Sequence, residues 1–245
     1  MPLPPHPLPY LLPQGEKDDV RKAIAMTEPA ALQRLLTWLS PAFPVGAFAW
    51  SAGLETAIAD RRITDATTVQ DWLAGAIAHG SLRTDAIVLA QAFAATAEAK
   101  ALAELAELYL ALTPARERQA ESTMTGNAFA IAAAAWPADV LARLPSPCPY
   151  PIAVGAVAAA HGIALEDMLL AFLTAAVHGQ VSVAVRLVPL GQTAGLKVMA
   201  ALEADIAALA RWATGATLAD LGGIAFAADI AQMRHETLEP RIFRS

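Results

Sequence analysis

Apolar residues recur along this chain at the three- and four-residue spacing of an α-helix, and no stretch alternates apolar and polar residues as a strand would. Leu32, Leu35, Leu36 and Leu39 illustrate the spacing, just after a helix start at Thr27-Glu28-Pro29. The pattern predicts an all-α fold, a single compact bundle of about nine or ten helices joined by short connections. After the first helix, the predicted helices cover residues 51–60, 66–79, 85–97, 99–112, 114–135, 152–161, 165–187, 191–213 and 224–235.

Alanine supplies much of the 56% hydrophobic content, whereas aromatic residues make up only 6%. Because alanine favours helix but adds little apolar surface, the helices are expected to approach closely around a core that is thin per residue. The pairs Thr64-Asp65 and Thr84-Asp85 each offer side-chain oxygens that can cap a helix start.

Two proline-rich stretches set the predicted boundaries. Residues 1–25 combine prolines with a charge run and lack a periodic apolar face, so a disordered tail is predicted there and a folded all-α domain over residues 26–245. Met26 stands directly before the first helix start and is a candidate initiator. The run Pro145-Ser-Pro-Cys-Pro-Tyr-Pro151, with the break at Trp136-Pro137, predicts a stiff surface connection between two helical halves.

The net charge of −6 and the lack of a basic stripe argue against nucleic acid as a partner, because phosphate binding needs clustered lysine and arginine. Residues 144–165 and 168–185 carry no charged side chain, which raises the question of a membrane span. The first stretch holds four prolines and the second is alanine-rich with polar residues near its middle, so buried helices are the better interpretation. No signal peptide is recognisable, and the single Cys148 fits a reducing compartment. A cytoplasmic protein without membrane contact is expected.

The histidines do not form a recognisable metal site. His79, His161 and His178 are each followed by glycine and have no carboxylate three or four residues away, so they are expected to be helix-end residues. His235-Glu236 is the only adjacent pair of possible ligands, and neighbours on a helix point in different directions. The sequence therefore predicts no metal site, and any metal would be bound only transiently.

Nucleotide and nucleophile motifs are also missing. Gly191-Gln-Thr-Ala-Gly-Leu-Lys197 differs from a phosphate-binding loop in its glycine spacing, in Leu196 before the lysine, and in Val198 where a hydroxyl is needed. No Gly-x-Ser-x-Gly turn occurs, and Cys148 has no nearby histidine to activate it. The sequence thus predicts a protein that is not an enzyme and has no cofactor of its own.

The segment Leu39-Ser-Pro-Ala-Phe-Pro-Val-Gly-Ala-Phe-Ala-Trp-Ser-Ala-Gly-Leu-Glu55, called here the signature segment, separates two helices and brings large apolar side chains into a loop. Its prolines forbid helix and Gly46 allows a sharp turn. Phe48 and Trp50 are larger than the residues that a solvent-exposed loop usually carries. Two interpretations remain open at this point: a buried corner between helices, or an element that faces a partner.

Arg186 ends a long uncharged run just before Pro189. Such an arginine must reach water, pair with a carboxylate or contact a partner. Glu55 is a plausible counter-charge, which would make the two an ordinary buried ion pair.

Residues 234–245, called here the tail, carry Phe243 between Arg241 and Arg244. Chain termini usually fray, and an aromatic side chain flanked by arginines is typical of binding hot spots. The tail is therefore expected to become ordered when it binds a partner, and its removal is expected to affect the core little.

The signature segment resembles the N-terminal motif of the urease accessory protein UreF family, which runs approximately Ser-Pro/Asn-x-Leu-Pro-Val-Gly-Gly-Phe/Tyr-Ser-Tyr/Trp-Ser-x-Gly-Leu-Glu. Further matches follow in the family's order: Arg116-Glu117 with Gly126, then Arg186-Leu-Val-Pro-Leu-Gly-Gln192, then Arg234-His-Glu-Thr237, then Arg241-Ile-Phe-Arg-Ser245. On these residues the chain is identified as a member of that family. It departs from the family's pattern at Ala47, Ala49, Leu196 and Glu239-Pro240.

The resemblance implies a partner-binding role in urease maturation. It implies that Glu55 and Arg186 contact the GTPase UreG and help nickel to pass through the complex. It also implies that the tail docks a second accessory protein, UreD (also called UreH), and shapes the surface that receives UreG. Nickel, GTP and Mg²⁺ would then act through the partner proteins. The expected partner-binding residues are Pro44, Gly46, Phe48, Trp50, Gly53, Glu55, Arg186, Gln192, Arg234, His235, Glu236, Arg241, Phe243 and Arg244.

Two functions are weighed. The first is a non-catalytic scaffold that bridges UreD and UreG and regulates GTP-dependent nickel delivery to the urease apoprotein. The rival is a helical small-molecule enzyme with a pocket lined by residues 41–55. An enzyme should show titratable residues that converge in a deep pocket, whereas a scaffold should show wide apolar patches at the signature segment and tail. A homodimer is also expected, because residues 165–187 are apolar on most faces and the resemblance points the same way.

Overall fold

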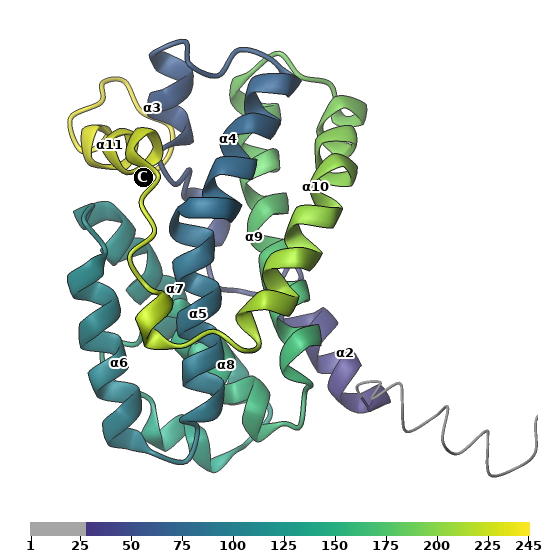
Figure 1. Ribbon diagram of the computed structural model, residues 1–245, viewed down its shortest axis with the longest axis vertical. Helices are drawn as coiled ribbons and strands as arrows, with labels where there is room; N and C mark the ends of the chain where they lie inside the picture. Colours follow the sequence, from purple (N-terminus) through teal and green to yellow (C-terminus); the bar gives the residue numbers. More distant parts are fainter. Residues whose placement is uncertain (1–27) are drawn as a thin grey trace, which may run out of the picture.

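The computed structural model of the chain describes residues 28–245, and these residues contain helices and loops with no strand (Figure 1). The all-α prediction is confirmed. The predicted tail over residues 1–25 and the candidate initiator Met26 lie outside the described residues. In chain order the α-helices are α2 (Pro29–Trp38), α3 (Leu54–Ala59), α4 (Ala66–His79), α5 (Ser81–Ala94), α6 (Ala99–Leu112), α7 (Arg116–Ala133), α8 (Tyr150–Ala160), α9 (Leu165–Leu187), α10 (Gln192–Ala213) and α11 (Phe226–His235), with short 3₁₀ helices η1 (Ala47–Ala49), η2 (Asp139–Arg143) and η3 (Leu218–Asp220).

Helix α5 packs against α8 at the centre of the molecule, and α8 is almost wholly enclosed. Residues 151–158 of α8 are all buried. Gly155 faces α5 so closely that a Cβ atom there would overlap the carbonyl oxygen of Leu89. The absence of a side chain lets the two backbones touch, as the alanine-rich composition predicts. Figure 1 shows α4 and α5 following one another through the middle, with α10 on one side and α6 on the other.

An aromatic cluster anchors the beginning of the signature segment to the bundle. Trp38, the last residue of α2, packs edge-on against Phe129 of α7 and against Trp136, with ring centroids 5.9 Å and 5.8 Å away. Phe43 of the signature segment joins the same cluster, 5.7 Å from Phe129. Edge-to-face contacts of this kind stabilise a pair by about 0.5–1.5 kcal/mol beyond their buried area.

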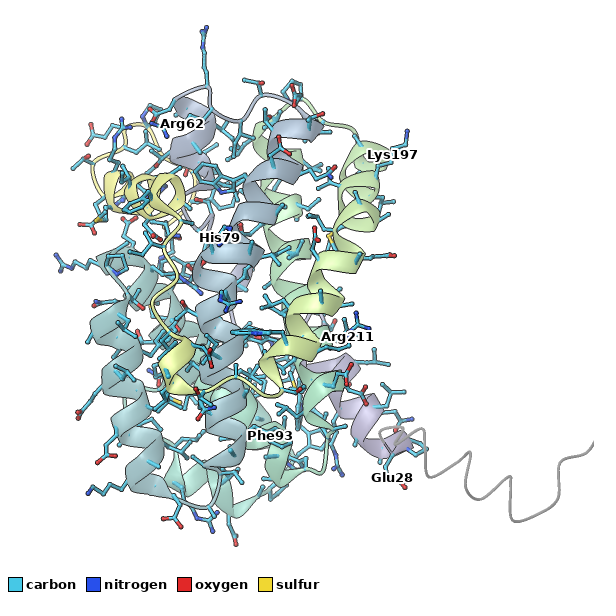
Figure 2. All side chains as sticks on the ribbon, in the orientation of Figure 1. Glu28, Arg62, His79, Phe93, Lys197 and Arg211 are labelled. Atoms are coloured by element: carbon cyan, nitrogen blue, oxygen red, sulfur yellow. The ribbon has the colours of Figure 1, made fainter. Side chains whose placement is uncertain are left out.

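The corner between α4 and α5 corrects one predicted helix cap. Asp65 caps α4 through the backbone N–H of Thr68, as predicted. Helix α5, however, begins at Ser81 after Gly80 rather than at Asp85, so Thr84 and Asp85 lie inside it. Asp85 is buried. Its carboxylate does not cap the helix but accepts hydrogen bonds from the side chains of Tyr109 and Arg118. Figure 2 labels His79, the last residue of α4, at this corner midway down the molecule.

The proline run does not divide the chain into two halves, and it is not wholly a surface connection. Helix α8, which follows the run, packs against both α5 and α7, and one hydrophobic core includes residues from either side. The physical reason is that α8 has no polar face and must be covered on all sides. Cys148 and Pro149 are buried with it, and burial raises the pKa of the Cys148 thiol to about 12.

Helix α9 spans residues Leu165–Leu187 as predicted. Among the described residues it is the one helix whose length and composition would allow it to cross a membrane, and 44% of its most apolar window is buried in the fold. Core helices pass the same test, so the indication of a span is weak. His178 lies in the middle of α9, which contradicts its prediction as a helix-end residue, whereas His79 and His161 do stand at helix ends.

Candidate partner-binding site

The signature segment has an exposed first part and a buried second part. Pro44 and Phe48 are exposed, and the Phe48 side chain is 75% exposed. Gly46 turns the chain between them with φ 74°. Trp50 and Glu55, in contrast, are each 7% exposed. The segment therefore combines both interpretations of the sequence: residues 50–57 form a corner packed inside the bundle, whereas Pro44 and Phe48 are exposed and Phe43 packs on the aromatic cluster.

Gly53 directly precedes α3, and two features of the backbone require glycine at this position. Its φ of 82° lies in the left-handed region that favours glycine. A Cβ atom at this position would also lie 2.8 Å from the backbone nitrogen of Gln232 in α11. Glycine thus allows α11 to lie directly against the signature segment.

The tail is docked on the signature segment in this structure, contrary to the expectation that it frays. The Arg244 N–H donates to the carbonyl of Ala49 at 2.9 Å, and the Ser51 N–H donates to the Ser245 carbonyl at 2.8 Å. The Ser51 hydroxyl also donates to that carbonyl. Phe243 is only 5% exposed and belongs to the hydrophobic core. The sequence could not reveal this docking, because backbone groups make most of its hydrogen bonds.

Glu55 holds the tail through three hydrogen bonds. Its carboxylate accepts the N–H of Ile242 at 2.7 Å, the N–H of Phe243 at 2.9 Å and Nε2 of His235 at 3.0 Å. Glu55 is therefore not the counter-charge of Arg186, and that predicted ion pair is wrong. The physical reason is that backbone donors and a histidine of the docked tail occupy the Glu55 carboxylate. Arg186 instead lies over the Phe243 ring.

His235 links Glu55 to a second carboxylate on α7. Its Nδ1 lies 2.7 Å from Oε2 of Glu117, and Oε1 of Glu117 accepts from Arg241 at 2.7 Å. Carboxylates only accept hydrogen bonds, so two N–H donors on His235, as in the imidazolium, satisfy this arrangement. Glu55, His235, Glu117 and Arg241 are called here the tail network. With both ring nitrogens of His235 protonated, the network contains two negative and two positive groups.

The protonation of Glu55 follows from these contacts. Burial by itself raises the pKa of a carboxyl group, but the hydrogen bonds from His235 and from the Ile242 and Phe243 N–H groups outweigh it, so the pKa of Glu55 lies below its ordinary value. Glu55 stays ionised at neutral pH and its acceptor oxygens stay available to the tail.

Arginines cover the docked tail from outside. Arg186 donates from Nη2 to the Phe48 carbonyl at 3.4 Å, and its guanidinium lies 4.6 Å from the centre of the Phe243 ring. The Arg244 guanidinium lies 4.8 Å from the centre of the Trp50 ring. Both arginines are exposed. The place where the tail meets the signature segment is called here the junction. Its outer face thus presents two cations beside the exposed Phe48.

The remaining predicted residues lie at the edge of this junction or away from it. Arg234 pairs with Asp60 at 2.5 Å, and Glu236 accepts the backbone N–H of Arg116 at 3.2 Å. As expected for neighbours on a helix, His235 is buried while Glu236 is exposed. Gln192 is exposed at the first position of α10 and forms no hydrogen bond with the tail network.

Sequence reasoning missed Glu117 and Ser51 as members of the site. Glu117 stood in the Arg116-Glu117 match, and Ser51 stood inside the signature segment, so both carried a signal. What the sequence lacked was any indication that α7 and the tail meet at His235. Residues so distant in the chain can be paired only once the fold is known.

A cavity of about 340 Å³ lies beneath the exposed part of the signature segment. Its walls come from residues 38–48, from Tyr150 and from α9, and its titratable lining residues are Tyr150, His178 and Arg186. The lining contains no carboxylate. Across residues 28–245, moreover, no cluster of three histidine, cysteine or acidic side chains could hold a metal ion.

Comparison with known proteins agrees with this geometry. The family model described as UreF matches residues 63–203. The urease accessory protein UreF of Rhizobium etli is 51% identical over 215 residues, which cover 88% of this chain and 96% of that protein. The proteins of the same name from Bradyrhizobium diazoefficiens and Rhodopseudomonas palustris are 50% and 46% identical over 229 residues, 91% of this chain and 95% and 94% of theirs. The chain belongs to the UreF family.

The family model ends before the tail and begins after the signature segment. The match to the family model therefore rests on the helical body, without the signature segment or the tail. These two segments, far apart in the sequence, meet in space at the tail network.

Proposed function

We propose that this UreF-family protein is a non-catalytic scaffold that bridges UreD/UreH and the GTPase UreG, and that it regulates GTP-dependent delivery of nickel to the urease apoprotein. One observation carries the proposal. The signature segment and the tail meet at one outward surface, where Phe48, Arg186 and Arg244 are exposed beside a tail that is held by Glu55 and by the Ala49 carbonyl. Aromatic and arginine side chains presented on a rigid support are typical of binding hot spots.

The proposed mechanism is conformational. A scaffold that binds one nucleotide state of the GTPase more tightly than the other couples that state to metal release, without reacting itself. Nickel, GTP and Mg²⁺ are then held by the partners. The docked tail supports this role because it lowers the ordering cost that a frayed tail would add to binding.

We further propose that the protein acts in the cytoplasm as a homodimer, without nucleic acid or membrane contact. The low-charge surface of α9 and the family relationship support self-association. The rival function, an enzyme with its pocket under the signature segment, is less well supported, because the titratable residues lining that cavity are Tyr150, His178 and Arg186, with no carboxylate among them.

The decisive experiment is capture of purified UreD and UreG by immobilised protein, with Phe48→Ala as the test variant. Phe48 is 75% exposed, so its loss should leave the melting temperature unchanged but weaken capture at least about tenfold. Ile131→Ala is the matched control, because Ile131 is 78% exposed on α7. Unchanged capture by Phe48→Ala would contradict the proposed surface. Titration calorimetry with GTP or Ni²⁺ adds a second check, since sub-micromolar binding of either by the isolated protein would contradict the scaffold role.

A further inference from the structure

A second cavity, of about 320 Å³, opens beside the outer face of α11 and is called here the α11 cavity. Its walls come from the first turns of α5, from the end of α6 and the loop after it, from Arg118 of α7, and from residues 223–233. In Figure 1 the segment between η3 and α11 runs up along α5 to reach this place. No residue of the α11 cavity belongs to the tail network.

Large apolar side chains gather on the rim of the α11 cavity. Phe226, Ile230 and Met233 stand at helical spacing on the outer face of α11 and are 71%, 45% and 42% exposed. Across the opening, Leu112 at the end of α6 is 44% exposed, and Ile224 is 54% exposed. Soluble proteins rarely concentrate exposed apolar residues in this way except at sites of interaction. Two facing apolar edges with a gap between them match the mode in which a partner helix lies in a groove.

The charged residues that line the α11 cavity are Asp85, Arg118 and Asp229, so its lining carries an excess of negative charge. Arg118 is held by Asp85, at 2.5 Å, and by Glu121, which lies outside the lining, at 3.1 Å. Tyr109 donates its hydroxyl to Asp85 at 2.8 Å but adds no positive charge. Asp229, a further lining residue at the start of α11, forms no ion pair with any residue in the 28–245 range.

Asp229 in particular lacks a compensating charge. Burial raises the pKa of its carboxyl group, and the hydrogen bond from the Ala225 N–H opposes that rise only in part. A half-buried carboxylate without a cation is costly, and the cost is relieved when a positive group enters beside it. The charge of the cavity therefore selects against an acidic partner and for a basic one.

We propose that the α11 cavity is a docking site for an amphipathic helix of a partner protein, whose apolar stripe packs on Phe226, Ile230 and Met233 and whose arginine or lysine reaches Asp229. The site lies on a different face of α11 from the tail network, so it adds a second surface to that of the proposed function. Apolar contacts would supply the affinity, and the carboxylates would supply the preference for a basic helix.

The test uses fluorescence anisotropy with two labelled helical peptides of about 14 residues, each with leucine at positions i, i+3, i+4 and i+7. One peptide carries an arginine beside the leucine stripe and the other carries glutamate there. The full chain should bind the arginine peptide at least about tenfold more tightly than the glutamate peptide. Equal affinity for the two peptides, or binding to neither, would overturn the proposal.

Two variants, each with a matched control, test whether the peptides bind in the α11 cavity. Asp229→Asn keeps the acceptor for the Ala225 N–H and should abolish the preference for arginine, whereas Asp205→Asn, an exposed aspartate on α10, should leave it intact. Phe226→Ser should lower the affinity for both peptides about tenfold, and Ile131→Ser should lower the affinity for neither. Circular dichroism confirms that each variant is folded. An unchanged preference in Asp229→Asn would overturn the proposal.

Two further measurements separate other occupants. N-acetyl-arginine amide alone should bind far more weakly than the peptide, and equal binding would instead indicate a small-molecule site. Light scattering should give the same mass for the wild type and for Phe226→Ser. A dimer that dissociates in this variant would show that a second copy of the chain covers the cavity, and would overturn the proposal.

Discussion

Two charge networks meet on neighbouring residues of α7, Glu117 and Arg118, and they differ in balance. The tail network joins Glu55 and Glu117 to His235 and Arg241, and it is balanced in charge when both ring nitrogens of His235 carry a proton. The network of Asp85, Arg118 and Glu121, called here the floor network, has one cation for two carboxylates. A network whose charges balance can hold a segment of the chain in place, whereas a network with an excess carboxylate can attract a cation from a binding partner.

The pKa values of Glu55 in the tail network and Asp85 in the floor network are shifted in opposite directions. Burial is the largest influence on both Glu55 and Asp85. At Glu55 the tail's N–H groups and His235 outweigh burial and lower the pKa. At Asp85 burial outweighs Arg118 and Tyr109, and the pKa is raised. The difference is that backbone donors reach Glu55 and none reaches Asp85.

The largest expected effect comes from removing the one cation of the floor network. Arg118→Met leaves Asp85 and Glu121 without their cation, which should cost about 3–5 kcal/mol of folding free energy. Thermal and urea unfolding measure this loss. The variant Asp85→Asn/Arg118→Met/Glu121→Gln removes all three charges and should lose less. If Arg118→Met were as stable as the wild type, the pairing inferred for this network would be incorrect.

A smaller and local effect is expected in the tail network. Glu55→Gln removes the charge from hydrogen bonds to Ile242, Phe243 and His235, so tail docking should weaken by about 2–3 kcal/mol. Hydrogen exchange should show faster exchange at the Ile242 and Phe243 amides, while the amides of α5 and α8 keep their protection. Loss of protection throughout the molecule would contradict the distinction between a local and a structural network.

Acidification should separate the two networks without mutation. Glu55 has a lowered pKa in the folded state, so its contribution is fully present above its ordinary value of 4.5 and is lost as the pH falls through the lower folded value. Asp85, with a raised pKa, relieves a burial cost when it becomes protonated. The tail amides should therefore lose protection below about pH 4.5, before the helical core unfolds. Simultaneous loss by circular dichroism and hydrogen exchange would argue against this order.

The helices could be predicted from the sequence because their information is local. The bounds of α4, α6 and α9 follow from apolar spacing and from residues such as Asp65 at their ends. Asp85 was wrongly predicted to cap a helix, because a capping aspartate and a buried aspartate look alike in local sequence. Only the packing of α5 on α6 and α7, which brings Tyr109 and Arg118 to it, distinguishes the two cases.

The candidate site could be predicted in its residues but not in its pairings. The signature segment and the tail contain nearly all of the junction, yet Glu55 was assigned to Arg186 because these are the conspicuous opposite charges. The actual partners of Glu55 include two backbone N–H groups, which every residue but proline possesses and which no sequence pattern marks. Nor could the sequence show that Phe243 is buried.

The smallest expected effect on folding tests whether the outer face of the tail serves binding. Arg244→Ala removes a guanidinium that lies over Trp50 in an exposed position, so the loss of stability should be about 0.5–1 kcal/mol. The backbone N–H that donates to Ala49 remains, and the tail should stay docked. Phe243→Ala is unsuitable for this purpose, because Phe243 belongs to the core and its removal would undock the tail, contrary to what the sequence suggested. Binding should therefore fall while folding barely changes, and capture of UreD together with the melting temperature of the same variant measures both. Normal capture and activation of urease by Arg244→Ala would show that the tail network orders the tail for a purpose other than partner binding.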